Sequence, residues 1–275
     1  MNQPRKIKIS VSKAKTFDQC KRKFYYQYIL KLSTELKDYN ALGSLVHLVL
    51  ELTFTKWLES NYKTPLREVA QDAWQSCKGT KEWMDAEKFD LIKKARGYAV
   101  QYFKKYETEY MEESKPIRCE PKFVLPIRIN ESLVAEVVGF IDRIDRIDQK
   151  TIWLFDYKTT NKVQYLDFFQ LGIYTAACLY GPYKNYKIEA AYVLLKHGMK
   201  LKEMSSPNET YIQEVEKMVK IVKEMDVTIN ETKLFPPCFT KLCDYCDFQS
   251  RCYKDTGGPP KMIPQSFSKT GADTW

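Results

Sequence analysis

The spacing of hydrophobic residues predicts that the chain is helical up to about residue 118. Apolar side chains recur every three or four positions, which is the period of an amphipathic helix. The predicted helices span residues 12–31, 42–60, 64–77 and 91–106. Ser12 is suited to cap the first helix, and the pair Thr64-Pro65 is suited to open the third.

After Pro116 the pattern changes to segments rich in Val, Ile, Phe and Leu with partial alternation, which is typical of β-strands. Three strands are predicted in a meander, over residues 122–129, 133–147 and 151–159. The elements predicted after them are a helix over 165–180, a strand over 188–195 and a helix over 211–225. We therefore expect an α/β fold in which helices flank a mixed central sheet.

Size and composition narrow the class of protein. The chain has 275 residues, of which 44% are hydrophobic and 29% charged, as in ordinary globular proteins that need no disulfides. No uninterrupted apolar run approaches the roughly 18 residues of a membrane span, so we expect no membrane integration. No apolar stretch follows the basic N-terminal residues, so we expect a reducing, cytoplasmic location, in a prokaryote or a phage-infected cell. The eight cysteines are then interpreted as metal ligands or buried thiols.

The positive charge is concentrated at the start of the chain. The net charge is +9, and residues 1–31 contain nine Lys or Arg side chains against the single acid Asp18. Aromatic residues, Phe24 and Tyr26 among them, are interleaved with these cations. Such a segment suits phosphate contacts and base stacking, as in single-strand binders. It equally suits a solvated helix face beside an aromatic core stripe, and both interpretations remain open.

The first candidate for chemistry lies in the predicted meander. The two-residue period of a strand places Asp156 and Lys158 on one face, opposite the aromatic residues around them. A hairpin centred on Gln149 sets Asp142 directly opposite Asp156, with Cβ atoms about 4.5 to 5.5 Å apart. Two carboxylates this close repel unless a cation lies between them, and their hard oxygen atoms suit Mg²⁺ or Mn²⁺. The alternative is that Asp142 is a solvated hairpin acid and that Lys158 only neutralises Asp156.

Two further groups are ambiguous by themselves. His47 lies on a strongly apolar predicted helix, where a histidine is more often a satisfied core residue than a ligand, and Glu51 lies one turn further on. Gln170 and Tyr174 are four residues apart on the helix after the Asp156 strand, which is also compatible with ordinary surface.

The second candidate is a group of cysteines near residue 250. Cys243, Cys246 and Cys252 form a C-x2-C-x5-C pattern, with Cys238 shortly before it and Cys20 far away in the basic segment. Three clustered thiols indicate a metal site. With Cys238 the site would be a local four-thiolate zinc knuckle, and with Cys20 it would join the two ends of the chain and could hold an iron-sulfur cluster.

Taken in order, these motifs resemble the RecB-like nucleases of the PD-(D/E)XK superfamily. They are similar in particular to its iron-sulfur group, which includes the CRISPR-associated adaptation exonucleases and the nuclease domains of recombination and replication helicases. The matching motifs are Ser12-x2-Lys15-x-Phe17-x2-Cys20-x2-Lys23-Phe24-Tyr25-Tyr26, Gly43-x3-His47, Gly139-x2-Asp142, Asp156-Tyr157-Lys158, Gln170-x3-Tyr174 and the late cysteines.

The resemblance implies roles for individual residues. Divalent ions would be held by four groups, which are His47, Asp142, Asp156 and the Tyr157 carbonyl. Lys158 would complete the catalytic set by positioning or activating the attacking water. A four-iron four-sulfur cluster would be held by Cys20, Cys243, Cys246 and Cys252. DNA contacts are expected from Gln170, Tyr174, Lys15, Lys23 and Tyr26.

On this basis we expect one nuclease domain over residues 1–255, with a helical insertion at about 60–118 and an iron-sulfur region formed by Cys20 and residues 238–252. Residues 256–275 lack periodicity and are expected to form a flexible tail. The expected activity is metal-dependent DNA exonuclease cleavage that prefers single strands or free ends. The chain has no G-x4-G-K-[ST] phosphate loop, so any helicase motor would come from a recombination or CRISPR partner. Two other classes stay open, a non-catalytic nucleic-acid-binding adaptor and a zinc-stabilised binding protein.

Overall fold

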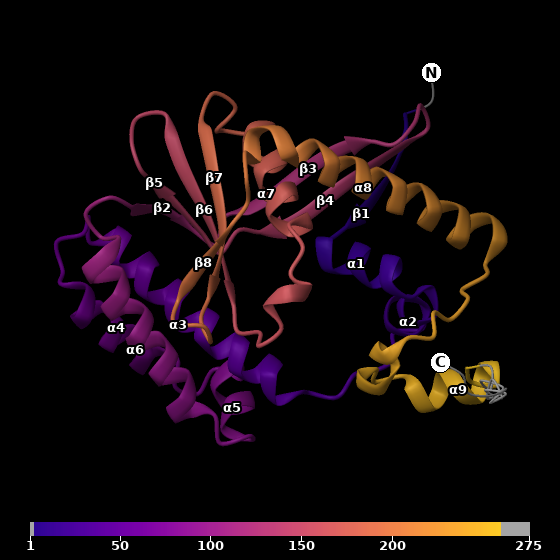
Figure 1. Ribbon diagram of the computed structural model, residues 1–275, viewed down its shortest axis with the longest axis horizontal. Coiled ribbons are helices and arrows are strands. Elements are labelled where there is room, and N and C mark those ends of the chain that lie inside the picture. Colours follow the sequence, from indigo (N-terminus) through magenta and orange to yellow (C-terminus); the bar gives the residue numbers. More distant parts are fainter. Residues whose placement is uncertain (1–2, 260–275) are drawn as a thin grey trace, which may run out of the picture.

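Two β-sheets form the centre of the molecule (Figure 1). The computed structural model describes residues 3–259. The smaller sheet has the strand order β1 (Arg5–Ile9), β4 (Leu133–Phe140), β3 (Lys122–Arg128). The larger sheet has the order β2 (Lys115–Cys119), β5 (Arg143–Arg146), β6 (Thr151–Lys158), β7 (Lys187–Leu194), β8 (Lys200–Glu203). Both sheets are mixed, because β1 runs parallel to β4 and β6 runs parallel to β7 while the other pairs are antiparallel.

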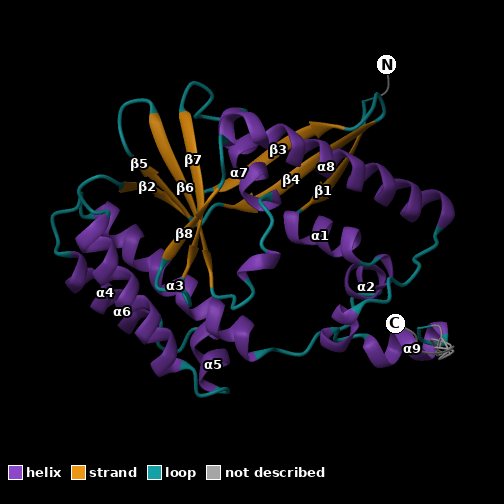
Figure 2. Ribbon diagram, viewed as in Figure 1, coloured by secondary structure: helices purple, strands orange, loops and turns teal. Residues whose placement is uncertain are grey.

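Helices cover both faces of the larger sheet, which confirms the predicted α/β class (Figure 2). On one face, apolar side chains of β6 and β7 pack against α3 (Asp38–Glu59), α4 (Leu66–Ser76), α5 (Lys81–Glu87) and α6 (Ile92–Glu109). The opposite face of the same strands packs against α7 (Phe169–Leu179). The long helix α8 (Pro207–Val227) lies beyond α7 and shares a core with the smaller sheet and with α1 (Val11–Gln19).

The predicted helix over residues 12–31 is interrupted at Cys20. Cys20 has extended backbone angles, φ −163° and ψ 111°. It is the C-cap residue of α1 and the N-cap residue of α2 (Lys21–Phe24). Its thiol accepts a hydrogen bond from the Lys23 backbone N–H at 3.5 Å. A π-helical turn, η1 (Tyr25–Ile29), follows. Because the backbone is extended at Cys20, its side chain does not point where it would point in a continuous helix.

The strand predictions need three corrections. The segment 133–147 is two strands in different sheets, because β4 ends at Phe140 and β5 begins at Arg143, so the predicted three-strand meander is wrong. β1 and β2 lie in parts of the chain that we predicted to be helical throughout. β1 had a signal in its alternation of Lys6 and Lys8 with Ile7 and Ile9, which a helical reading of the basic segment overlooks.

The last part of the chain surrounds the cysteines. It comprises two turns, η3 (Thr228–Thr232) and η4 (Lys241–Tyr245), and the helix α9 (Gln249–Thr256). Figure 1 shows α9 near α2, although more than 200 residues separate the two helices in the sequence. The predicted flexible tail begins inside α9, and its greater part, residues 260–275, lies outside the described residues.

Helix α3 is the central helix of the fold. Among the described residues it is the one helix long and apolar enough to cross a membrane, by length and composition alone. Half of that apolar window is buried inside the protein, where Leu45, Val49 and Phe54 pack in the core shared with β6. Its apolar character is therefore accounted for by core packing.

Candidate metal centre

The hairpin of β5 and β6 has the predicted register. Arg143 pairs with Phe155 and Asp145 pairs with Trp153, so Asp142, one residue before β5, continues the register towards Asp156. The Asp142 Oδ2 atom accepts a hydrogen bond of 2.7 Å from the Tyr157 backbone N–H. Asp142 also lies where the chain passes from the smaller sheet to the larger one. The two carboxylates thus approach each other at the junction between the sheets.

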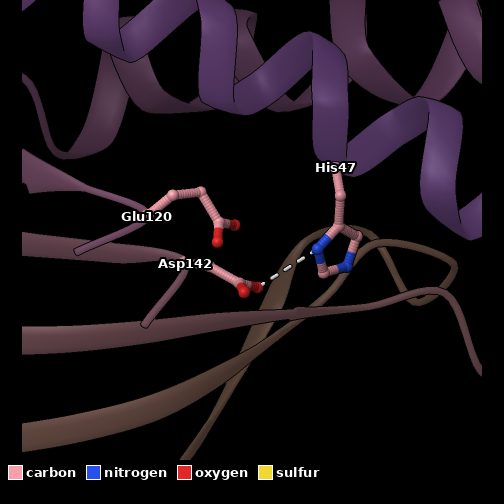
Figure 3. A group of neighbouring side chains, drawn as sticks. All are labelled: His47, Glu120 and Asp142. Atoms are coloured by element: carbon pink, nitrogen blue, oxygen red, sulfur yellow. Dashed lines mark ion pairs between the residues drawn. The ribbon is translucent and has the colours of Figure 1, made fainter. Parts of the chain in front are cut away.

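Helix α3 brings His47 to the same place. The His47 Nδ1 atom is 3.3 Å from Asp142 Oδ2, and Nε2 is 2.8 Å from the Tyr157 carbonyl oxygen (Figure 3). The close approach depends on Gly43, one turn earlier, because a Cβ atom there would lie 3.0 Å from Thr159 Oγ1. Three of the predicted ligands, His47, Asp142 and the Tyr157 carbonyl, are therefore brought together.

Glu120 is a site residue that sequence reasoning missed. Ligand atoms of His47, Glu120 and Asp142 all lie within 4.8 Å of one another, and Figure 3 shows their side chains converging. Glu120 has a left-handed backbone, φ +47°, and its N–H donates a 3.1 Å hydrogen bond to the Asp142 carbonyl. The available signal was an acid in the turn Cys119-Glu120-Pro121 before a strand, which alone indicates little.

The ionisation of these groups reflects their crowding. Burial, and then the neighbouring Asp156, raises the pKa of Asp142 well above its usual range. Burial, and then Asp142, raises the pKa of Glu120 to about 7. Burial lowers the pKa of His47, so the imidazole is neutral and can offer a lone pair. Crowded carboxylates beside a neutral imidazole are a donor set that a divalent cation would satisfy, so the residues fit the metal that the resemblance implies.

Asp156 and Lys158 face α7 rather than α3. The Lys158 Nζ atom is 2.6 Å from Asp156 Oδ2 and donates a 2.9 Å hydrogen bond to Gln170 Oε1. Gln170 Nε2 in turn donates to the Tyr174 hydroxyl at 2.6 Å. Asp156 is 1% exposed, so its carboxylate is buried with the Lys158 ammonium as its direct partner.

The polar chain behind Lys158 bears on the predicted DNA contacts. Tyr174 is 5% exposed, its ring packs against Phe123 and its hydroxyl accepts from Gln170, so it lies behind the residue that contacts Lys158. Gln170 is half-buried and contacts Lys158 directly. The structure thus gives this pair a role in orienting Lys158, and a direct contact between Gln170 and DNA stays a prediction.

A buried arginine contacts the Tyr157 hydroxyl on the face of the sheet that packs against α3 and α6. Arg143 is 1% exposed, donates from Nη1 to the Tyr157 hydroxyl at 3.0 Å, and lies 2.8 Å from Asp145 Oδ1. Its guanidinium carbon lies 4.2 Å from the Phe54 ring centroid, and rings of α6 and β6 complete the cage. Ser114 donates to Asp145 at 2.6 Å. This cluster joins the helical layer to the strand that carries Tyr157.

The late cysteines and Cys20 converge although most of the chain separates them. One small cavity of about 30 Å³ is lined by Cys20, Cys238, Cys243, Cys246 and Cys252. The Cys238 backbone N–H donates to the Cys20 sulfur at 3.4 Å. In the described part of the chain, no three of these sulfur atoms lie within 4.8 Å of one another. Cys77 and Cys178, by contrast, are buried in the core, and burial raises the pKa of each thiol.

The basic segment is packed as a structural element. Tyr26 is 0% exposed and its hydroxyl donates to Asp255 at 2.8 Å, so it offers no ring face to DNA and that prediction is wrong. Phe24 is equally buried, which favours the aromatic core stripe over the stacking surface. Lys15 pairs with Asp167 at 2.6 Å, and Lys23 lies beside the cysteine cavity. DNA contacts by these two lysines stay predictions.

Comparisons with known proteins give one strong match. The family profile of the PD-(D/E)XK nuclease superfamily matches residues 8–253. Among solved structures, the crystal structure of SSO0001 is 14% identical, with a TM-score of 0.42 over 89% of this chain and 85% of that chain. A crystal structure named "Putative exonuclease" from Eubacterium rectale is 16% identical, with a TM-score of 0.42 over 86% of each chain. No curated protein matched the sequence.

Proposed function

Because the chain belongs to the PD-(D/E)XK nuclease superfamily, we propose that it is a divalent-metal-dependent deoxyribonuclease that degrades DNA from its ends. The single observation that carries the proposal is the convergence of His47, Glu120 and Asp142 beside the Asp156-Tyr157-Lys158 strand. A match that covers nearly the whole chain and a site built from four separate segments support the same chemistry.

The metal would be held by oxygen and imidazole donors. His47, Asp142, Asp156 and the Tyr157 carbonyl are the ligands that we propose, and Glu120 adds a further carboxylate. Hard oxygen donors with one imidazole suit Mg²⁺ or Mn²⁺. When bound, such an ion polarises the phosphodiester and stabilises the charge that develops on the departing oxygen.

Lys158 would position the attacking water. A lysine ammonium has three N–H donors, and contacts with Asp156 and Gln170 occupy two of them. The third remains for a water molecule or a phosphate oxygen at the cleft. The Gln170–Tyr174 hydrogen bond fixes the orientation of Lys158 from behind, so the direction of the third donor is set by packing and not by the substrate.

The cysteine site is proposed to hold a four-iron four-sulfur cluster through Cys20, Cys243, Cys246 and Cys252. The convergence of Cys20 with the late cysteines around one cavity supports a site that joins the two ends of the chain. Its role is structural, because it fastens α2 to η4 and α9.

The proposed substrate is DNA with a free end, preferably single-stranded, in recombination, repair, replication or CRISPR adaptation. The net charge of +9 supports binding of a polyanion. A motor protein that supplies unwound ends, such as a helicase of a recombination system, would be the natural partner.

The test compares end-labelled linear single strands with closed circular single strands in the presence of Mn²⁺. We expect loss of the linear DNA alone, and a rate lower by on the order of a thousandfold in Asp156→Ala. Asp148→Ala, an exposed acid in the β5–β6 turn, is the matched control and should retain full activity. Cleavage of circles would make the enzyme an endonuclease, and binding without any cleavage by cluster-containing protein would reject the proposal in favour of a binding module.

A further inference from the structure

A cleft of about 750 Å³ connects the metal centre with the cysteine segment. His47 and Lys158 line one end of it, and Leu242 and Tyr245 of η4 line the other. The side walls come from the first turns of α3 and from the loop after β6. The cysteine segment is therefore part of the approach to the reactive groups.

The charge of the cleft is of one sign. Lys158, Lys162 and Lys196 contribute to its lining, and the described residues that line it include no carboxylate, because Asp156 is buried beneath the surface. Such a surface attracts an anion along its length. A DNA strand supplies phosphates at regular intervals for Lys162 and Lys196, whereas Lys158 already pairs with Asp156.

Aromatic rings stand at the mouth of this cleft. Tyr245 is 70% exposed and Tyr39 is 54% exposed. The Lys162 Nζ atom lies over the Tyr245 ring, 4.6 Å from its centroid. An exposed ring next to ammonium groups provides both a stacking platform and a phosphate partner, which is the combination found in single-strand binding grooves.

The loop that presents Lys162 is fixed in place. The Lys162 backbone N–H donates to Thr160 Oγ1 at 3.0 Å, and a ring nitrogen of His197 lies 3.1 Å from the Thr160 carbonyl oxygen. On the other side, Thr240 caps η4 through the Leu242 N–H, which sets the turn that carries Tyr245. Lys162 is thus held by the loop after β6, and Tyr245 is held by η4, which is part of the cysteine segment.

We propose that Tyr245 and Lys162 form a clamp that stacks an unpaired base of single-stranded DNA and binds its phosphate at the mouth of the catalytic cleft. The proposal rests on the proposed function and adds the reason for a single-strand preference. In a duplex, both faces of every base are covered by its neighbours, so a tyrosine ring can stack only on an unpaired or frayed end. The clamp would therefore select unpaired strands before they reach Lys158.

The test measures binding by the full-length, cluster-containing protein with Ca²⁺ in place of Mn²⁺, so that cleavage does not interfere. Single strands carrying 2-aminopurine at successive positions report stacking as fluorescence quenching. We expect quenching at one position in the wild type, its loss in Tyr245→Ala, and a roughly five- to hundredfold weaker affinity for single strands with unchanged affinity for duplex. Tyr245→Trp should retain both signals.

Two further variants keep the test decisive. Lys162→Ala lies outside the cysteine segment, and it should weaken binding and lower the salt dependence by about one phosphate contact. Tyr180→Ala removes an equally exposed ring, 73% exposed, that does not line the cleft, and should bind as the wild type. The iron content of Tyr245→Ala is compared with the wild type, so that loss of the cluster is recognised.

The outcomes separate the two proposals. If the protein cleaves linear strands while Tyr245→Ala and Lys162→Ala bind them as tightly as the wild type, the clamp is wrong and the nuclease stands. If Tyr245→Ala lost affinity equally for single strands and duplex, the clamp would also be rejected, because the result would indicate phosphate contact without base stacking. If the wild type neither binds nor cleaves DNA, the proposed function itself fails.

Discussion

At the scale of single residues, the metal centre is notable for its excess of carboxyl groups. Asp142, Asp156 and Glu120 lie near one another, and Lys158 compensates only Asp156 directly. Repulsion among them stores an unfavourable electrostatic energy in the metal-free protein. A divalent cation removes that repulsion, so the same residues that bind the metal destabilise the fold without it.

The pH dependence of stability in Glu120→Gln tests whether carboxylate repulsion destabilises the metal-free protein. The pKa of Glu120 is about 7 in the fold and 4.5 in an unfolded chain, so the fold favours the protonated form. The metal-free wild type therefore loses stability as the pH rises from 4.5 through 7, and the variant lacks this loss. We expect the variant to be more stable by about 1–2 kcal/mol at pH 8, with a gain that shrinks towards pH 4.5, because Glu120 is only half-buried.

Urea-induced unfolding of the metal-free proteins across this pH range measures the effect. Glu131→Gln, at an exposed turn between β3 and β4, is the control and should follow the wild type. The Mn²⁺ affinity of Glu120→Gln, followed by electron paramagnetic resonance, should fall even where stability rises. Superimposable stability curves for Glu120→Gln and the wild type would contradict the assigned ionisation.

At the scale of elements, the site depends on how closely α3 approaches the end of β6. Gly43 faces Thr159 so tightly that an added Cβ would lie 3.0 Å from its hydroxyl oxygen, whereas Gly97 in α6 has no atom within 4 Å of such a Cβ. Both positions lie in helices, where alanine is intrinsically more favourable than glycine. The two positions differ in the space available for an added Cβ atom.

We expect Gly97→Ala to stabilise the protein by about 0.5–1 kcal/mol and to leave Mn²⁺ affinity unchanged. Gly43→Ala should gain less stability and weaken Mn²⁺ binding several-fold, because α3 and His47 must move away from Tyr157. Adding Thr159→Ala to Gly43→Ala removes the obstructing hydroxyl and should restore affinity. Isothermal titration with Mn²⁺ decides the matter, and equal affinities for the two glycine variants would exclude the proposed contact.

The helical layer is joined to β5 and β6 by the buried pair of Arg143 and Asp145. Arg143→Met should destabilise the protein by about 3–5 kcal/mol, because Asp145 would stay buried without its cation. Combining it with Asp145→Leu removes the unpaired charge and should recover much of the loss. Chemical denaturation of the single and double variants gives the comparison, and a neutral single variant would show that the ion pair carries little stability.

Elements with local signals were predictable from the sequence, and those defined by distant partners were not. The register of Asp142 and Asp156 follows from a short hairpin, and the alternation along β6 follows from its own side chains. The division of residues 133–147 is set by β1 and β2, which pair with its two halves from far away in the chain. Gly139 and Asp142 flank Ile141, but in an otherwise strand-like sequence they do not distinguish a local bulge from a change of sheet.

The site shows the same division between local and distant causes. His47 was identified by resemblance, since a histidine on an apolar helix has no pattern of its own. Glu120 was missed because its position depends on a left-handed turn and on Asp142. Tyr26 was misassigned because its burial depends on α9, more than 200 positions later, through Asp255.

At the scale of the whole molecule, the cysteine site closes most of the chain into one loop. Cys20 lies between α1 and α2, and the other thiols lie in η4, just after it and in α9, so a cluster would reinforce the packing of Tyr26 against Phe248. A cross-link over so long a loop stabilises by about 5–5.5 kcal/mol in the chain-entropy description. The clamp residue Tyr245 lies between Cys243 and Cys246, two of the proposed cluster ligands.

We expect Cys20→Ser to lose its brown colour and iron, and to become sensitive to proteolysis between residues 233 and 248. Cys238→Ser is the matched control in the same cavity and should keep its iron, because Cys238 is the additional thiol. Iron and zinc are measured by mass spectrometry on protein purified without oxygen. A colourless wild type with stoichiometric zinc that depends on Cys238 would overturn the assignment.

The parallel pairing of β1 with β4 sets the order in which a growing chain can fold. Arg5 pairs with Leu133, and at roughly 5–20 residues per second a ribosome needs about 6 to 26 seconds to supply that partner. The apolar face of α1 waits longer, until Met218 and Ile221 of α8 have been made. β1 and α1 thus find their packing partners late in synthesis, and until then their apolar side chains lack the cover that the finished fold gives them.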